Sequence, residues 1–242
     1  MRLITTNYIE QKTILPKTGR HIIAQFDDEG VVVYQAYRQE IGDFAATNGY
    51  FGGDCFSLDR MSWIKPNFLW MMYRSGWGKK DGQEVVLAVK IRRTAFDTIL
   101  ANAIWSKYLP EQYPTEKDWK RAGFNSDVRL QWDPDHSPVG GKLERKAIQL
   151  GLRGDMLALY ARDWIIWIED ISEFVYEQHQ NLGNLDRLIV PKETIYPVID
   201  LKVAAHLQIS NSLIDDYKRN FCLSDESSQM NLYSSISKII SS

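Results

Sequence analysis

One stretch constrains the fold of this chain more than any other, because it combines a long apolar run with cations at both ends. Residues Leu58–Gly78 read LDRMSWIKPNFLWMMYRSGWG, and Phe68–Tyr73 within them is apolar in every direction. A helix that is apolar all round is buried among other elements. The run is too short to cross a membrane. We therefore expect a core helix with Pro66 in its first turn and Gly76 or Gly78 at its end.

The three cations of this stretch, Arg60, Lys65 and Arg74, permit two interpretations. Long cationic side chains at the ends of a buried helix can simply extend to water. They can also form a clamp for phosphate or carboxylate, in which the arginines provide planar forks and the lysine a point charge. A base or a nicotinamide ring could stack on the tryptophans of the same stretch, Trp63, Trp70 and Trp77. Both interpretations stay open at this point.

The remaining patterns predict a mixture of strands and helices. We expect strands at His21–Phe26, Val31–Tyr37, Glu84–Ile91, Val128–Asp133 and Lys146–Leu152. The turn sequence between the first two predicts a hairpin. We expect helices at Arg38–Asn48, Thr94–Ile104 and Arg153–Ile171, with an irregular segment at 106–126. Strands that neither alternate strictly with helices nor run consecutively favour an α+β fold around a mixed, largely antiparallel sheet with flanking helices.

Domain organisation follows from the same patterns. Residues 1–198 are expected to form a single α+β domain. Residues 199–242 are expected to be a C-terminal extension that is partly helical and, at its serine-rich end, partly disordered.

Composition narrows the classes of function. The formal net charge of −2 provides no global basic field to recruit nucleic acid or an anionic membrane. Cys55 and Cys222 lie far apart and outside any CxxC spacing, as expected for thiols in a reducing compartment. The N-terminus lacks the apolar region of a signal peptide, so we expect a cytoplasmic protein. The four histidines show no paired spacing, and we expect no metal site.

Two strands carry polar side chains that invite a functional interpretation. Gln35 stands on an otherwise apolar strand, where it either faces solvent or binds a ligand amide or hydroxyl. Gln131 and Asp133 stand near the end of another strand, beside Trp132. A carboxylate there can steer a sugar hydroxyl or act as a base. The alternative is an Asp-Pro turn that Asp133 caps.

Four blocks carry a resemblance to a known family. The segments DDEGVVVYQAY, RMSWIKPNFLWMMYRSGWG, VRLQWDPDH, and KAIQLGL followed by DWIIWIED resemble domain-of-unknown-function family 4291 over roughly residues 18–198. The chain is similar, more distantly, to the ADP-ribosyltransferase-like superfamily. That resemblance implies a split core of two small facing sheets and the cleavage of NAD. It also implies a first-strand Arg or His on the NAD ribose, an aromatic side chain on nicotinamide, and a late-strand Glu or Gln near the oxocarbenium-like transition state.

The resemblance assigns roles to particular residues of this chain. Gln35 takes the first-strand position, where some subgroups have His, and Gln131 or Asp133 takes the late position. The chain departs from the superfamily pattern, because it has no clear Ser-Thr-Ser strand motif and no Glu-x-Glu. Because these motifs are missing, the resemblance alone does not define the function, which depends on the residues of the site.

Two different functions are consistent with these residues. The first is an NAD-dependent ADP-ribosyltransferase, with NAD as substrate, no metal, and a macromolecular acceptor such as RNA or DNA. It needs a pyrophosphate clamp, a stacking slot and a negative group beside the developing ribosyl cation. The cofactor-binding candidates are Arg60, Lys65, Arg74, Tyr34, Trp63 and Tyr37, and the catalytic candidates are Asp133, Gln131 and Gln35. The second is a non-catalytic module that binds a nucleotide or nucleic acid through the same cations and aromatics.

Overall fold

The computed structural model describes residues 1–210. The chain divides into two compact units, Met1–Val198 and Ile199–Ser242, and each is described by itself. In the second unit, helix α8 (Leu201–His206) begins after Asp200, whose carboxylate accepts hydrogen bonds from the backbone N–H groups of Lys202 and Val203. This is the usual chemistry of a helix N-cap. The serine-rich end of the extension lies outside the described residues.

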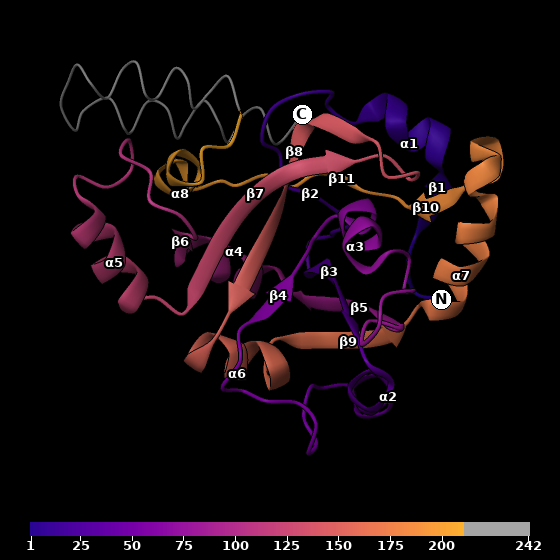
Figure 1. Cartoon of the computed structure of the whole chain (residues 1–242), viewed down its shortest axis with the longest axis horizontal. Coiled ribbons are helices and arrows are strands. Elements are labelled where there is room, and N and C mark those ends of the chain that lie inside the picture. The colour runs from indigo at the N-terminus through magenta and orange to yellow at the C-terminus, as the bar shows by residue number, and fades with distance from the viewer. Residues whose placement is uncertain (211–242) are drawn as a thin grey trace. The chain divides into compact units, whose positions relative to one another are not determined.

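The first unit is a mixed α+β fold, which confirms the fold class expected from the sequence (Figure 1). Its strands are β1 (Thr5–Asn7), β2 (Ile23–Ala24), β3 (Gly30–Tyr37), β4 (Ser62–Ile64), β5 (Val85–Arg92), β6 (Ala103–Trp105), β7 (Val128–His136), β8 (Lys142–Leu152), β9 (Ile165–Asp170), β10 (Ile189–Pro191) and β11 (Thr194–Ile195). Its α-helices are α1 (Tyr8–Ile14), α2 (Gln39–Asn48), α3 (Phe68–Ser75), α4 (Arg93–Ala101), α5 (Glu116–Phe124), α6 (Gly154–Arg162) and α7 (Ser172–Gln180). Two short 3-10 helices follow, η1 (Asn181–Gly183) and η2 (Leu185–Arg187).

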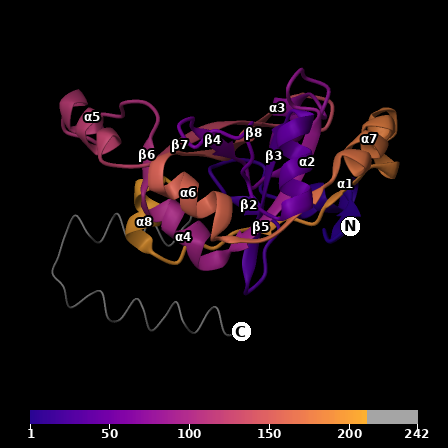
Figure 2. The ribbon, with the colours of Figure 1, turned by 90° about the horizontal axis from the view of Figure 1, so that it is seen from below.

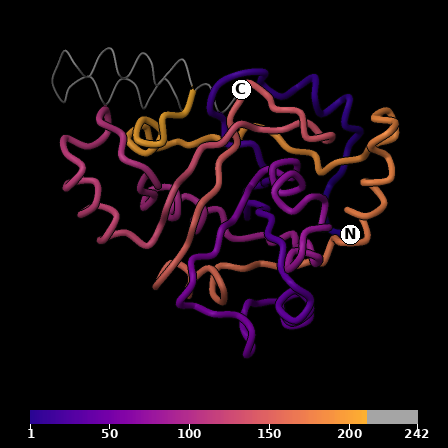
Figure 3. Tube along the Cα trace, in the orientation of Figure 1, coloured from indigo at the N-terminus to yellow at the C-terminus, as the bar shows by residue number. Residues whose placement is uncertain are grey.

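The strands form two main sheets and two small pairs. One main sheet has the order β3-β5-β9 and the other the order β4-β8-β7-β6, and Figure 2 shows β4, β7 and β8 on one side of β5. The pairing between β6 and β7 is parallel, and every other ladder in residues 1–210 is antiparallel. The small pairs, β1-β10 and β2-β11, bind the N-terminal segment to the end of the unit, and their traces run together in Figure 3.

A single backbone bridge joins the two main sheets. The N–H of Tyr34 in β3 donates to the carbonyl oxygen of Lys65 at 2.7 Å, and the N–H of Lys65 donates to the carbonyl oxygen of Tyr34 at 3.2 Å. Because Lys65 directly follows β4, this bridge holds the end of β4 against the middle of β3. It also brings the residues that flank the two bridge positions close together.

Helix α3 is the core helix expected from the sequence, although it begins two residues after Pro66. The side chain of Asn67 accepts from the N–H of Trp70 at 2.7 Å and so caps the start of the helix. The helix ends at Ser75, and Gly76 with φ 60° forms its C-cap. Phe68–Met72 is buried, whereas Tyr73 is 41% exposed. The helix contacts β3 and β7, which belong to different sheets, so its buried residues meet neighbours on more than one side (Figure 1).

The predicted helix at Arg153–Ile171 is confirmed in its first half, as α6, and is wrong after Arg162. Helix α6 ends at Arg162, and the next residues form strand β9, in which Ile168 pairs with Val89 of β5. The apolar spacing of this segment fits a helical period. However, the β-branched run IIWIED completes a three-stranded sheet by hydrogen bonding to β5, and this tertiary pairing overrides the local pattern.

Three further predictions need correction. The segment 106–126 contains helix α5, which begins after Thr115, whose hydroxyl accepts from the N–H of Asp118 at 3.1 Å. Helix α4 begins at Arg93 without a side-chain cap and ends at Ala101, because the following residues form β6. The hairpin at Phe26–Val31 closes by one bridge only, since β2 pairs with β11 and β3 with β5.

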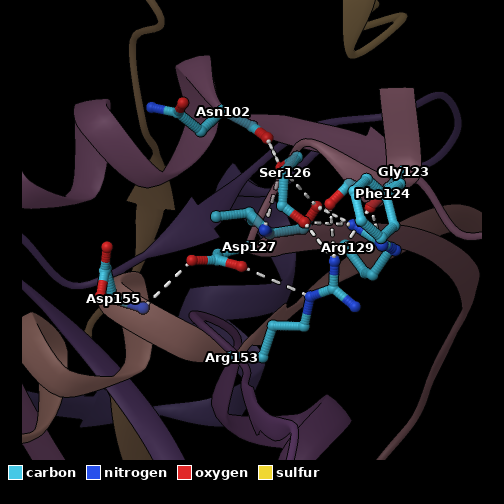
Figure 4. Close-up of polar contacts among 9 residues, drawn as sticks. Asn102, Gly123, Phe124, Ser126, Asp127, Arg129, Arg153 and Asp155 are labelled. Atoms are coloured by element: carbon cyan, nitrogen blue, oxygen red, sulfur yellow. Dashed lines mark hydrogen bonds and ion pairs between the residues drawn. The ribbon is translucent and has the colours of Figure 1, made fainter. Parts of the chain in front are cut away.

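Two arginines brace the end of α5 against the start of α6 (Figure 4). Arg153 donates to the carbonyl oxygens of Gly123, Phe124 and Ser126 at 3.0–3.2 Å, and Arg129 also donates to the carbonyl of Gly123. Cations near the last carbonyls of a helix are favourable, because those groups lack partners within the helix. Arg129 is therefore held in a structural role.

A buried ion pair stabilises the β7–β8 hairpin. The Nε of Arg145 in β8 lies 2.6 Å from the Oδ2 of Asp135 in β7, and their side chains are only 8% and 1% exposed. Arg145 also donates to the carbonyl of Pro16, which binds the N-terminal segment to the hairpin. None of the helices in residues 1–210 has the length and apolar character needed to cross a bilayer.

We predict that Arg145→Leu lowers the free energy of unfolding by about 3–5 kcal/mol, because it leaves the Asp135 carboxylate buried and unpaired. Urea denaturation measures the change. The matched control is Lys120→Ala, which removes the exposed pair between Lys120 and Glu116 and should cost no more than about 0.5 kcal/mol. Equal losses in the two variants would contradict the prediction.

Candidate functional site

A cavity of about 760 Å³ opens where the two main sheets meet. Its walls come from the end of β3, the loop that leads into β4, the later half of α3, and β7 and β8. The lining residues are Gln35, Ala36, Tyr37, Arg38, Ile41, Cys55, Phe56, Ser57, Arg60, Met61, Ser62, Trp63, Lys65, Met71, Arg74, Gly82, Gln83, Gln131 and Gln149. The size is typical of a small-molecule site.

Most of the residues selected from the sequence meet in this cavity. They are Gln35, Tyr37, Arg60, Trp63, Lys65, Arg74 and Gln131. Asp133 is not on the wall, but it binds two residues that are. Tyr34 points away, because successive side chains of a strand face opposite sides. Its ring is fully buried and lies edge-on to Phe68 with the ring centroids 5.5 Å apart, so it offers no stacking surface to the cavity.

Gln35 is fixed by a closed set of hydrogen bonds. Its Nε2 donates to the Tyr37 hydroxyl and to the Ser62 hydroxyl, both at 2.8 Å, and its Oε1 accepts from the Tyr160 hydroxyl at 2.6 Å. The side chain is 2% exposed, which excludes the interpretation of a solvent-facing glutamine. Burial raises the pKa of Tyr37 to about 12, so its hydroxyl stays neutral near pH 7. The network presents oriented hydroxyl groups at the cavity wall.

A second polar cluster lies on the β7–β8 hairpin. Gln131 and Gln149 are cross-strand partners, and the Nε2 of each donates to a different oxygen of Asp133 at 2.8 Å. Because each amide N–H group points to the carboxylate, each amide oxygen is left as an acceptor on a residue of the cavity wall. Asp133 therefore acts on the cavity through these two glutamines rather than by direct exposure.

Lys65 is the most unusual group of the site. Its side chain is 7% exposed, and its Nζ donates to the carbonyl oxygen of Trp63 at 3.2 Å. No carboxylate within residues 1–210 forms an ion pair with it. Burial, together with the neighbouring charge of Arg74, lowers the pKa of Lys65 to about 7, while Asp133 acts in the opposite direction. Lys65 therefore does not extend to water, unlike Arg60 and Arg74, which are exposed.

The described wall of the cavity is strongly cationic. It carries Arg38, Arg60, Lys65 and Arg74, and it includes no Asp or Glu. Arg38 has a loose, exposed pairing with Glu40 at 3.6 Å, and the Arg74 guanidinium lies 5.7 Å above the ring of Trp70. A buried cation costs free energy unless it is paired. The arrangement is therefore suited to a ligand with two or more negative charges.

Trp63 gains its position from a glycine in the neighbouring strand. Trp63 in β4 pairs with Gly151 in β8. A Cβ atom at Gly151 would lie 3.0 Å from the Trp63 ring and 2.6 Å from the sulfur of Met61, far closer than side chains normally approach. Gly151 thus lets Trp63 and Met61, both lining residues, lie directly on the hairpin.

Sequence reasoning missed several groups of this site. Tyr160 comes from a distant segment, and Ser62 lies beside Trp63 in the central stretch but was not selected. The role of Gln149 becomes visible only once Gln131 is known to lie opposite it. The adjacency of Arg38 to the polar end of β3 was a signal that could have been used. Within the described chain, no three His, Cys, Asp or Glu side chains gather in a way that could hold a metal ion.

Comparison with known proteins gives a family but no activity. A family model described as a domain of unknown function (DUF4291) matches residues 21–196, which is well over half of the chain and includes every residue that lines the cavity. No curated protein matches the chain.

The lowered pKa of Lys65 predicts a pH dependence of stability. Between about pH 7 and 10.5 the unfolded chain keeps a proton on this amine that the folded chain lacks, so stability rises with pH across this window. Lys65→Met should remove that rise, which amounts to at most about 1.4 kcal/mol per pH unit. Urea denaturation at pH 7, 8.5 and 10 measures it. The exposed lysine variant Lys107→Met should keep the wild-type profile. An unchanged slope in Lys65→Met would refute the assignment.

Proposed function

The chain belongs to the DUF4291 family, and we propose that it is an NAD-dependent ADP-ribosyltransferase acting on a macromolecular acceptor. The observation that carries the proposal is the meeting of four cations, a tryptophan and two fixed glutamine clusters in one cavity whose described wall has no acid. We further propose that the two main sheets, joined at Tyr34 and Lys65, form an ADP-ribosyltransferase-like core. The proposal includes a cytoplasmic location, in which the exposed thiol of Cys55 stays reduced.

The clamp for the pyrophosphate is the part of the proposal with the most support. Arg60 and Arg74 are exposed, so their forks can meet phosphate oxygens, Arg74 from its place over the Trp70 ring. The backbone of Lys65 is held in place by the bridge. A bound pyrophosphate supplies the counter-charge that Lys65 lacks, so it favours the protonated amine. The binding energy of the pyrophosphate, which does not react, holds the reacting ribose in position.

The other parts of the site would hold the nucleoside and its leaving group. In this proposal Trp63 stacks on the nicotinamide ring, and the hydroxyl groups of Tyr37 and Ser62, oriented by Gln35, bind the ribose hydroxyls. The hydrogen bond between Tyr37 and Ser62 at 2.6 Å keeps these two groups together. Half-buried, prearranged hydroxyl groups of this kind lose little entropy when a ligand binds.

The reaction breaks the bond between C1′ of the ribose and the nicotinamide nitrogen. Nicotinamide leaves as a neutral molecule with the bonding electron pair, and an acceptor oxygen or nitrogen then bonds to C1′ and releases its proton. Positive charge develops on the ribose in between. We propose that the amide oxygens of Gln131 and Gln149, whose N–H groups are bound to the Asp133 carboxylate, face this charge and stabilise it.

A second candidate function is a non-catalytic module that binds a nucleotide or nucleic acid. It is favoured by one observation: among the described residues, no carboxylate reaches the cavity wall. Under this alternative the same cations bind phosphate, and Asp133 serves only to fix the two glutamines. Binding of nucleic acid would then weaken steeply with salt, because phosphate contacts would dominate.

We predict that the purified protein releases nicotinamide from NAD and transfers labelled ADP-ribose to RNA, DNA or protein. Lys65→Met should weaken NAD binding at least about tenfold, since it removes the charge held at the centre of the clamp. The matched control is Lys107→Met, an exposed lysine that does not line the cavity. Isothermal titration and a filter assay measure the two effects. No nicotinamide release with any acceptor, combined with no NAD binding, would refute the proposal.

Asp133→Asn separates the two candidates. It preserves size but removes the charge that polarises Gln131 and Gln149. For the transferase we expect a loss of transfer of about 100-fold or more with NAD binding nearly unchanged, because the group acts on the transition state. The binding module instead predicts ligand binding without nicotinamide release in either wild type or variant.

A further inference from the structure

A second cavity, of about 180 Å³, lies at the N-terminal end of α3 and shares no lining residue with the first. Its walls come from α1, the segment after it, the start of α3, β8, and the residues around β10. Their polar residues include Gln11, Lys12, Lys17, Arg145 and Glu193. Neither proposed function uses this cavity.

One buried acceptor in this cavity has no partner. Gln11 is 3% exposed, and its Nε2 donates to the carbonyl oxygen of Glu193 at 2.5 Å, but its Oε1 accepts no hydrogen bond. Rotating the amide by half a turn would not help, because it would bring Oε1 against that carbonyl oxygen. A buried acceptor without a donor is unfavourable, so the position calls for an N–H or O–H group from elsewhere.

Two neighbouring polar side chains, those of Glu193 and Arg145, already have partners. The carboxyl of Glu193 accepts from the N–H of Phe68 at 2.8 Å and from the Nδ2 of Asn67 at 3.0 Å. Arg145 binds Asp135 and the carbonyl of Pro16. Among the described lining residues, the Oε1 of Gln11 is therefore the one fully buried side-chain polar atom that is unsatisfied.

The apolar part of the cavity limits the size of a ligand. Leu15, Phe68, Leu69, Leu143 and Val190 provide aliphatic and aromatic walls. A cavity of roughly 150 Å³ with such walls accommodates one benzene ring. The present cavity of about 180 Å³ is thus large enough for one six-membered ring with a single polar substituent.

The solvent side of the cavity is positive. Lys12 and Lys17 are lining residues and are exposed, so they stand where the cavity meets water. Neither forms an ion pair with a carboxylate in the described part of the chain. A negative group at the outer end of a ligand would complement them, although the attraction at an exposed position is screened by salt.

We propose that this cavity is a second ligand site, which binds a single-ring aromatic molecule with an O–H or N–H donor at its inner end and an anionic group at its outer end. The donor bonds to the Oε1 of Gln11, the ring lies among the apolar walls, and the anion faces Lys12 and Lys17. The site adjoins Asn67 and Phe68, where α3 begins, and α3 also carries Arg74 of the central cavity.

Three probes of nearly equal size test each part of the proposal. 4-Hydroxyphenylacetate has the ring, the donor and the anion, phenylacetate lacks the donor, and tyramine replaces the anion with a cation. We expect 4-hydroxyphenylacetate to bind about tenfold more tightly than phenylacetate, because only the first satisfies Gln11. Tyramine should bind more weakly than 4-hydroxyphenylacetate, with a difference that shrinks as salt rises. Titration calorimetry and ligand-observed NMR measure the affinities.

Two variants make the test specific. Gln11→Met keeps the side-chain size and should abolish the advantage of 4-hydroxyphenylacetate over phenylacetate. The double change Lys12→Glu with Lys17→Glu alters exposed positions only, so it should fold normally and favour tyramine instead. Binding of none of the probes, equal affinity for all three, or unchanged preferences in both variants would overturn the proposal. None of these outcomes depends on NAD binding in the central cavity.

Discussion

The site depends on the backbone bridge between Tyr34 and Lys65. β3 is an edge strand of one main sheet and β4 an edge strand of the other, and the bridge fixes how the end of β4 meets β3. Because strand residues alternate in direction, fixing Tyr34 toward α3 also fixes Gln35 toward Tyr160. On the other strand, it holds the backbone of Lys65 where the side chain enters the cavity. Two hydrogen bonds thus place a buried glutamine and a buried lysine on one wall.

The central cavity contains a buried amine, that of Lys65, without a carboxylate partner among the described residues. An amine with 7% exposure and no carboxylate partner is unfavourable when charged, and its pKa falls accordingly. The buried arginine of the β7–β8 hairpin shows the contrast, because Asp135 lies 2.6 Å from it. The same chain therefore pairs one buried cation and leaves another unpaired at a cavity. An unpaired buried amine with a lowered pKa is a common feature of sites that bind an anionic ligand.

Much of the fold was predictable from residues with strong local patterns. The apolar block at Phe68–Met72 gave α3, and the β-branched run at Val85–Arg92 gave the central strand β5. The prediction failed in the second half of 153–171, where a helical period continues across helix α6 and strand β9. There the pairing of β9 with β5 decided the structure. The free edge of β5 requires a partner strand, but nothing in the local sequence of 165–170 indicates that requirement. Helix α5 was missed although Thr115 and Asp118 carried a capping signal.

The sequence by itself determined which residue types were available to the site: three cations around an apolar helix, a tryptophan, and glutamines on strands. It also determined that the fold would be α+β, because its periods of two and of 3.6 are mixed along the chain. Only the tertiary structure decided that Gln35, Lys65 and Gln131 share a cavity, that Tyr34 does not, and that Asp133 acts through its neighbours. The physical reason is that local patterns fix the direction of a side chain relative to its own element. The register between sheets fixes what that side chain meets.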